Sequence, residues 1–269
     1  MNNNLTFIGI IPARYASTRF PGKPLAMLGG MTMIERVYRQ VSKALDRVVV
    51  ATDDDRIMAA VEAFGGKAVM TSTEHCSGTD RCQEAYLKNG GGEDVIINIQ
   101  GDEPFIQPDQ LKAIMACFDD PTTDIATLVR PFDPSRPYSE LENPNTPKVV
   151  LDNEMRARYF SRSVIPFVRG KEPDEWPTAT QYYTHVGMYA YRAQVLEAIT
   201  RLPQSPLELA ESLEQLRWLE NGYTIKAGIT TTATIGIDTP EDLAHAQLSS
   251  NNTFKTNRPF GREIIQIIH

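Results

Sequence analysis

Short runs of apolar, β-branched residues alternate with helix-like patterns from residue 7 to residue 119. The runs over residues 7–11, 47–51 and 95–99 are typical of buried strands. Helices are predicted over residues 33–45, 54–64, 78–89 and 108–119. This alternation is the rhythm of βαβ units, so the first half of the chain is expected to form a Rossmann-like nucleotide-binding layer of the α/β class.

The regular spacing breaks at about residue 131, where prolines separate short β-like pieces such as Lys148–Leu151. We interpret residues 131–185 as a lobe inserted into a single domain of residues 1–248. The chain then returns to the core through a predicted strand (182–191), a helix (206–220), a strand (224–229) and a last helix from Pro240. Residues 249–269 form a tail to which the sequence assigns no role.

The loop after the first predicted strand carries three cations, Arg14, Arg19 and Lys23. They would emerge at the carboxyl end of a sheet, where open α/β sheets bind ligands. Ser17, Thr18 and Gly22 lie among them and favour close approach of an anion to backbone N–H groups. The loop therefore predicts a polyphosphate site, although it lacks the GxxxxGK[ST] pattern of a P-loop. The alternative is that these cations simply keep a surface loop solvated.

Two aspartates are candidate metal ligands. Asp102 follows the predicted strand over residues 95–99. Asp238 precedes Thr239, Pro240 and Asp242, which suit the N-cap, N1 and N3 positions of a helix and leave the Asp238 side chain free. Two carboxylates suit Mg²⁺, which prefers few carboxylates together with phosphate oxygens and water. Spacing alone leaves open that Asp102 caps a turn and that Asp238 is itself the N-cap.

Composition excludes several classes of protein. A net charge of −7 and a pI near 5.2 argue against nucleic acid or an anionic membrane as the main partner. The three cysteines lack CxxC spacing, so neither a disulfide framework nor a zinc site is indicated, and a reducing cytoplasm fits best. No apolar run approaches the roughly 20 residues that span a bilayer. We expect a cytoplasmic protein that is not embedded in a membrane.

Several motifs along the chain resemble those of a known protein family. The string PARYASTRFPGKPL, with Pro12, Arg14 and Lys23, resembles the signature of sugar-acid cytidylyltransferases. The match is best for the 3-deoxy-manno-octulosonate (Kdo) cytidylyltransferases and continues, in order, through ATDDDRI, SGTDR, NIQGDEP, KVVLD, YFSRSVIP, HVGMYAYR, LEQLRWLENGY and GIDTPEDL. The resemblance implies a three-layer nucleotidyltransferase fold with a mixed, mostly parallel sheet. It also implies a homodimer joined largely through the inserted lobe, and transfer of a cytidylyl group from CTP to Kdo for lipopolysaccharide synthesis.

The resemblance also implies roles for individual residues. Lys23, Arg14 and Asp102 would be catalytic, and Asp102 and Asp238 would hold Mg²⁺ against the triphosphate. The nucleotide would be bound by Pro12, Ala13, Arg14, Ser17, Lys23, Thr52, Asp53, Ser77, Gly78, Arg81 and Gln100. Ordinary helix capping by Asp53 or by Thr79 with Asp80 would give the same local pattern.

The sugar acid would be bound by Gln100, Arg162, His185, Tyr189, Glu211, Glu214 and Gln215, with Arg162 as the carboxylate partner. Strand alternation predicts that His185, Gly187, Tyr189 and Tyr191 share one face. On the helix over residues 206–220, Leu209, Leu213, Leu216 and Leu219 are expected to form the core stripe. Glu211 and Gln215 would then lie one turn apart on another face. A structural histidine and solvated glutamates are the alternatives.

Two other functions remain compatible with the sequence. The nearer is a nucleotidyltransferase that uses another sugar acid, such as a sialic acid, or a sugar 1-phosphate with another nucleotide. The other is a non-catalytic nucleotide-binding or regulatory protein on the same fold. The retention of Lys23, Asp102 and Asp238 argues against the second.

Overall fold

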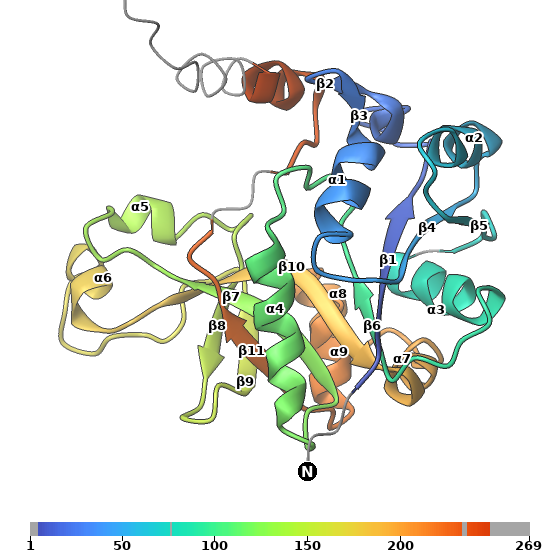
Figure 1. Cartoon of the computed structure of the whole chain (residues 1–269). Helices are drawn as coiled ribbons and strands as arrows, with labels where there is room; N and C mark the ends of the chain where they lie inside the picture. The colour runs from blue at the N-terminus through green and yellow to red at the C-terminus, as the bar shows by residue number, and fades with distance from the viewer. Residues whose placement is uncertain (1–4, 76, 233–235, 248–269) are drawn as a thin grey trace, which may run out of the picture.

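The computed structural model describes residues 5–75, 77–232 and 236–247. A nine-stranded sheet forms its centre, with seven strands in the order β11-β7-β10-β6-β1-β4-β5 and with β8 and β9 attached at β10 (Figure 1). The strands are β1 (Phe7–Ala13), β4 (Val48–Thr52), β5 (Ala68–Met70), β6 (Val95–Asn98), β7 (Ile125–Pro131), β8 (Lys148–Leu151), β9 (Ala157–Ser161), β10 (Tyr183–Arg192) and β11 (Ile225–Ile229).

Most neighbours along this path are parallel. β6, β1, β4 and β5 run in one direction, and β11 pairs parallel with β7. β10 lies antiparallel between β6 and β7. The expected mixed, mostly parallel sheet is confirmed, and the carboxyl ends of β1, β4, β6 and β7 lie along one edge.

Helices cover both faces of the sheet and give three layers. One face packs against α1 (Met33–Val41), α2 (Asp55–Ala63) and α4 (Pro108–Ala116). The other packs against α3 (Gly78–Lys88), α7 (Ala193–Ile199) and α9 (Gln215–Glu220). Central strands such as β4 are buried on both faces, which explains why they read as continuous apolar runs rather than alternating ones.

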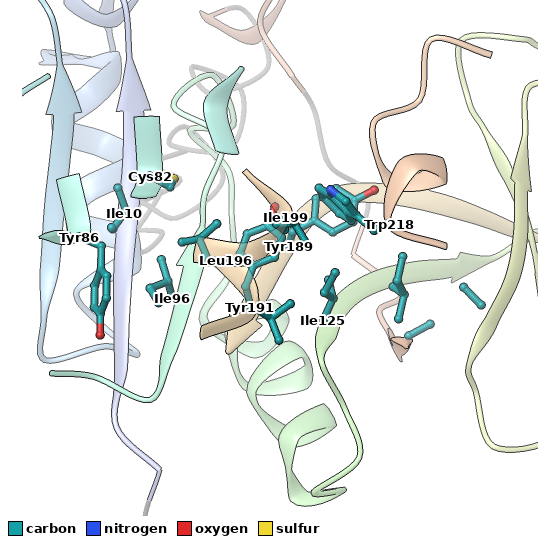
Figure 2. Packing of buried hydrophobic residues seen from close by; sticks show 14 of the residues in the cluster. Ile10, Cys82, Tyr86, Ile96, Ile125, Tyr189, Tyr191, Leu196, Ile199 and Trp218 are labelled. Carbon is teal, nitrogen blue, oxygen red and sulfur yellow. The ribbon is translucent and has the colours of Figure 1, made fainter. Parts of the chain in front are cut away.

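The second of these cores is rich in aromatic rings. Figure 2 shows Tyr189 and Tyr191 of β10 beside Trp218 of α9, with Ile199 and Leu196 next to them. The Trp218 ring meets both tyrosine rings edge-on, with centroids 5.0 and 5.5 Å away. Such contacts fix α9 against β10, and so set the position of the residues just before α9.

The lobe between β7 and β10 has a small core of its own. Leu141, Trp176 and Tyr182 are its buried members, and they bring together α5 (Tyr138–Leu141) and α6 (Trp176–Ala179). β8 pairs with both β9 and β10, so the lobe continues the central sheet. Its predicted limits of 131–185, within a single domain of residues 1–248, stay a prediction, and the tail 249–269 lies outside the described residues.

The single helix predicted over residues 206–220 is wrong. Ser212 adopts a left-handed conformation with φ of 50° and ends α8 (Pro206–Glu211), after which α9 starts at Gln215. The break turns Leu209 out to solvent, where 61% of it is exposed, whereas Leu213 and Leu216 are buried as predicted. Glu211 and Gln215 belong to different helices, so the expected spacing of one turn between them is also wrong.

The last described segment returns to the amino-terminal half. Residues 240–247 are helical and lie beside the hairpin of β2 (Met27–Leu28) and β3 (Met31–Thr32), as Figure 1 shows. Ile237 and Ala246 pack with Leu28 and Met33 in a separate buried cluster. This packing places Asp238 close to the loop that follows β1.

Candidate nucleotide and metal site

A cavity of about 470 Å³ lies at the carboxyl ends of β1 and β6. It brings together predicted residues from four separate segments: Pro12, Ala13, Arg14, Ser17, Lys23, Ser77, Gly78, Arg81, Gln100, Asp102 and Asp238. Ala16, Thr18, Arg19, Pro24 and Gly101 complete its lining. Every predicted nucleotide-binding residue therefore reaches this cavity except Thr52 and Asp53.

The loop after β1 folds back on itself before the short helix η1 (Lys23–Leu25). Gly22 precedes η1 with φ of 71°, a conformation that other residues rarely adopt, and its N–H donates to the Tyr15 carbonyl at 2.9 Å. The Ser17 Oγ accepts from the Phe20 N–H at 3.3 Å. Arg14 is exposed at the cavity wall and makes no hydrogen bond or ion pair with any other described residue. The loop thus presents the Arg14 guanidinium to the cavity.

Asp102 and Asp238 converge on one ammonium group. The Lys23 Nζ lies 2.7 Å from Asp102 Oδ2 and 3.1 Å from Asp238 Oδ1. Arg19 contacts the other oxygen of Asp238 at 3.3 Å. The Ile237 N–H donates to the Asp102 carbonyl at 3.0 Å and ties the two acidic segments together. The two candidate metal ligands therefore lie within reach of a common cation.

The Asp238 side chain is free for this contact because its neighbours cap the helix. The Asp242 N–H donates to Thr239 Oγ1 at 3.2 Å, and Asp242 Oδ2 accepts from the Thr239 N–H at 2.9 Å. The same Asp242 oxygen accepts from the backbone of Asp238 at 3.0 Å. These hydrogen bonds lower the pKa of Asp242. The capping box predicted from the sequence is confirmed.

The donor set fits Mg²⁺. The described residues contain no group of three or more His, Cys, Asp or Glu that could cage a metal. A pair of carboxylates that already hold one cation between them supplies the two or so oxygens that Mg²⁺ takes from a protein when phosphates and water complete its shell.

Arg81 forms the far wall of the cavity and is almost completely buried, with 1% exposed. It donates to Asp53 Oδ2 at 2.7 Å and to the Thr71 hydroxyl. Asp53 is thus paired with Arg81. The N-cap of α2 is the next residue, Asp54, which accepts from the Arg56 N–H at 2.9 Å. Thr52 is buried beneath this pair. Binding of the nucleotide by Thr52 and Asp53 stays a prediction.

Ser77, and not Thr79, caps α3, and it also reaches the cavity. Its Oγ accepts from the Asp80 N–H at 3.1 Å. A Cβ placed on Gly78 would lie 3.7 Å from the Asn98 amide nitrogen and 3.8 Å from Pro12, which is ordinary van der Waals contact, and Gly78 itself lines the cavity. The start of α3 therefore offers backbone N–H groups to an anion.

Gly101 and Gln100 fix the loop that carries Asp102. A Cβ on Gly101 would lie 2.8 Å from the Pro12 carbonyl oxygen, so only glycine lets this loop approach the end of β1 so closely. The Gln100 Nε2 donates to the Gly187 carbonyl at 3.0 Å and links the loop to β10. This bond places Gln100 between the nucleotide cavity and the predicted sugar-acid residues of β10.

His185 and Tyr189 share a face of β10, as predicted. Their ring centroids are 5.3 Å apart, and Tyr191 stacks on Tyr189 at 6.1 Å. The register shift between Val186 and Tyr189 adds two residues to β10, which preserves the alternation. The His185 Nε2 lies 3.0 Å from the Thr127 hydroxyl. Burial lowers the pKa of His185 to about 4, so its ring is neutral near pH 7.

Arg162 and Glu211 serve the break between α8 and α9 in this structure. The three guanidinium nitrogens of Arg162 donate to the carbonyls of Glu211 at 2.6 Å, Pro144 at 2.9 Å and Ser212 at 3.2 Å. The Glu211 carboxylate accepts from the Ser161 hydroxyl at 2.6 Å and from the Arg162 N–H at 2.9 Å. Both residues are therefore engaged in a structural clamp, and their contacts with a sugar acid stay a prediction.

Glu214 and Gln215 stand at the start of α9. The Glu214 carboxylate accepts from the Thr79 hydroxyl at 2.8 Å and from Arg217 at 2.7 Å, and burial raises its pKa. Gln215 is buried, and its Nε2 has no hydrogen-bond partner among the described residues. Glu214 also lines a second cavity, of about 600 Å³, that adjoins the first at Ser77.

Sequence reasoning considered Thr79 only as a helix cap and gave no role to Glu103. Thr79 lies two residues after Ser77 and is 2% exposed, and its hydroxyl connects the nucleotide-side helix α3 with Glu214. Glu103 directly follows Asp102, and burial together with the Asp102 charge raises the pKa of its carboxyl to about 7. Its place next to a candidate ligand was the only available signal.

The three-layer fold, with cations and two aspartates at the carboxyl edge of its sheet, defines a nucleotide-binding α/β protein of the nucleotidyltransferase class. The model of the cytidylyltransferase family matches residues 8–226. The 3-deoxy-manno-octulosonate cytidylyltransferase of Bacteroides thetaiotaomicron is 66% identical over 243 residues, which are 90% of this chain and 97% of that protein. The chain belongs to the 3-deoxy-manno-octulosonate cytidylyltransferase family.

More distant relatives agree. The protein of the same name from Myxococcus xanthus is 48% identical over 88% of this chain and 93% of its own length. A solved CMP:2-keto-3-deoxy-manno-octonic acid synthetase in complex with CTP is 41% identical, with a TM-score of 0.84 over 92% of this chain and 99% of its own. In the described part of the chain, no helix has the length and apolar character needed to cross a bilayer.

Proposed function

We propose that this chain transfers a cytidylyl group from CTP to the anomeric hydroxyl of Kdo, giving CMP-Kdo and pyrophosphate for lipopolysaccharide synthesis. The observation that carries the proposal is the convergence of Asp102, Asp238 and Lys23 in one cavity at the carboxyl edge of the sheet. Relatives at 66 and 67% identity carry the name of this activity, which makes Kdo and CTP the preferred pair of substrates.

Cationic side chains of the opening loop bind the triphosphate. Arg14 has no partner among the described residues and Arg19 is largely exposed, so both can turn to phosphate oxygens at little cost. Lys23 follows them from η1, and the start of α3 at Ser77 and Gly78 adds backbone donors. This arrangement neutralises the charge that moves onto the leaving pyrophosphate, which is the main requirement of phosphoryl-group transfer.

Asp102 and Asp238 would hold Mg²⁺ against the triphosphate. When bound there, Mg²⁺ supplies charge neutralisation on the phosphates and a lower pKa for an attacking hydroxyl, so no histidine base is needed. The His185 ring, whose pKa is lowered to about 4, is a weak base near pH 7, which agrees with a positioning role rather than with proton abstraction. The carboxylates keep their spacing because the Ile237 N–H bonds to the Asp102 carbonyl.

The sugar acid enters beside the nucleotide. Its hydroxyls are bound by the Glu214 carboxylate, which lines the second cavity, by Gln100, which lines the first and bonds to β10, and by the buried amide of Gln215. The assigned sugar site is completed by Arg162, His185, Tyr189 and Glu211. Arg162 gives up its hydrogen bonds to backbone carbonyls and binds the Kdo carboxylate instead. The anomeric oxygen then attacks the α-phosphorus in line, the bond to pyrophosphate breaks, and CMP-Kdo forms.

The enzyme works as a homodimer in the cytoplasm. The lobe offers an apolar group for a partner subunit, since the Phe167 ring is 72% exposed and packs on one side against Trp176. Cys82 and Cys117, the two described cysteines, are free and buried, which suits a reducing compartment. Sedimentation of the purified chain tests the dimer.

A pyrophosphate-release assay tests the reaction. CTP, Mg²⁺ and Kdo should give release, while replacement of CTP by UTP or ATP, or of Kdo by a sialic acid, should reduce it strongly. Equal release with a sialic acid would assign the chain to another sugar acid. Nucleotide binding without any release would indicate a regulatory protein.

A further inference from the structure

Lys23 lies where a cation is needed to hold Asp102 and Asp238 together. Each carboxylate gives one oxygen to the same ammonium nitrogen, at 2.7 and 3.1 Å. Only 15% of the Lys23 side chain is exposed, against 30% of Asp102 and 45% of Asp238. The Lys23 side chain is thus the least exposed of the three, and its ammonium offsets the repulsion between two neighbouring negative charges.

We propose that the Lys23 ammonium is an internal counter-ion that keeps divalent cations away from Asp102 and Asp238 until a nucleotide binds. The inference rests on the proposed function, because it takes these aspartates as the metal-holding pair. The same two oxygens cannot bind an ammonium and a divalent cation at once, so the two cations compete. The ammonium is part of the chain and therefore has the advantage whenever nucleotide is absent.

The charges around the cavity explain how the exchange occurs. Arg14, Arg19 and Lys23 carry three positive charges, and Asp102 and Asp238 carry two negative ones, so these five groups leave one net positive charge. Arg81 does not alter this balance, because Asp53 pairs with it. Before nucleotide binds, the site therefore attracts a polyphosphate more readily than a metal ion. Once phosphates are present, the long flexible stem of Lys23 lets its ammonium move to them and release both carboxylates.

The direct test measures Mn²⁺ binding to the full chain without nucleotide, from the electron paramagnetic resonance signal of free Mn²⁺. Lys23→Met keeps the apolar stem and removes the charge, and it should bind Mn²⁺ about tenfold more tightly than the wild type or better. Lys112→Met is the matched control, since Lys112 is exposed and pairs with exposed Asp109. It should bind as the wild type does. Adding Asp102→Asn to Lys23→Met should abolish the gain.

Thermal unfolding gives a second readout that does not require activity. Lys23→Met removes the charge that the two carboxylates share and leaves only the exposed Arg19 against Asp238, so its midpoint should fall without metal and recover with Mn²⁺. The wild-type midpoint should change little under the same conditions. Equal Mn²⁺ affinity in the two proteins, or equal shifts of their midpoints, would overturn the counter-ion role.

The two proposals fail in different ways. If wild-type protein releases pyrophosphate from CTP and Kdo but Lys23→Met gains no Mn²⁺ affinity, the proposed transfer reaction is supported and the counter-ion role of Lys23 is contradicted. If Lys23→Met gains Mn²⁺ affinity that depends on Asp102 while the wild type releases no pyrophosphate, the counter-ion role of Lys23 is supported and the proposed transfer reaction is contradicted.

Discussion

Arg162 donates two hydrogen bonds to Glu211: the Arg162 Nε donates to the Glu211 carbonyl at 2.6 Å, and the backbone N–H of Arg162 donates to the Glu211 carboxylate at 2.9 Å. Arg162 directly follows β9, and Glu211 is the last residue of α8. The pair therefore joins the inserted lobe to the helix break that precedes Glu214 and Gln215.

Arg162→Ala should loosen this join. The loss of three donors to backbone carbonyls should lower the free energy of unfolding by about 2–3 kcal/mol, measured by urea unfolding. Because Glu214 and Gln215 follow the break, KM for Kdo should rise more than KM for CTP. Arg162→Lys cannot make the three-way contact and should not restore either quantity. Equal changes in both KM values would show that the clamp has no connection with the sugar site.

Asp102→Asn and Asp238→Asn should each reduce kcat by about 10²-fold or more, because an amide keeps the shape of the side chain but not the charge that holds a cation. The capping box of Thr239 and Asp242 is independent of the Asp238 side chain, so the fold should be preserved. Pyrophosphate release and circular dichroism together check this. Turnover at the wild-type rate in either variant would remove that aspartate from the metal site.

Gly101→Ala should disrupt the loop between β6 and Asp102. The new Cβ would meet the Pro12 carbonyl oxygen at 2.8 Å, and backbone on both sides must move, which should lower stability by about 1–3 kcal/mol and reduce CTP binding. Gly187→Ala is the matched control, since no described atom lies within 4 Å of a Cβ there. Thermal unfolding of both variants measures the difference, and similar loss in the two would contradict the steric argument.

His185 should make stability depend on pH. Its pKa is lowered from 6.5 to about 4 by burial, so between these values the unfolded chain binds a proton that the folded chain does not. Stability should therefore fall as pH drops from about 6.5 to about 4, by on the order of 1 kcal/mol or more. Glu103 changes stability in the opposite direction over part of this range, because its pKa is raised to about 7.

The comparison of wild type with His185→Gln isolates the histidine contribution. Urea unfolding at pH 5 and pH 7.5 should show a smaller loss on acidification in the variant than in the wild type. Parallel pH dependence in the two proteins would mean that His185 is not held neutral.

The sequence was sufficient for features that depend on local chemistry. Strand positions followed from apolar runs, and the cap of Thr239 followed from a hydroxyl residue three positions before an acidic one, Asp242. The approach of Asp238 to Lys23 could be expected only from the family resemblance, because it depends on the packing of Ile237 and Ala246 against the β2–β3 hairpin.

The predictions from the sequence that proved wrong failed for physical reasons. Nothing in LELAESLEQL marks Ser212 as a left-handed residue, and the Arg162 guanidinium that binds the carbonyls of Glu211 and Ser212 comes from a segment about 50 residues away in the sequence. Leu209 therefore appeared to belong to a continuous apolar stripe. Asp54, and not Asp53, is the N-cap of α2, because the Asp53 carboxylate pairs with the buried Arg81. This pairing joins residues 28 positions apart, so the local sequence pattern does not reveal it.

The hydrogen bond from Ile237 to Asp102 has a consequence for biogenesis. All nine strands of the sheet are complete by Ile229, so a nascent chain released at that point would contain the entire central scaffold. It would nevertheless lack Asp238, one of the two carboxylates that contact Lys23. The ribosome thus completes the sheet before it synthesises the segment that carries Asp238. Proteolytic removal of residues from the carboxyl terminus should therefore abolish turnover before it unfolds the sheet.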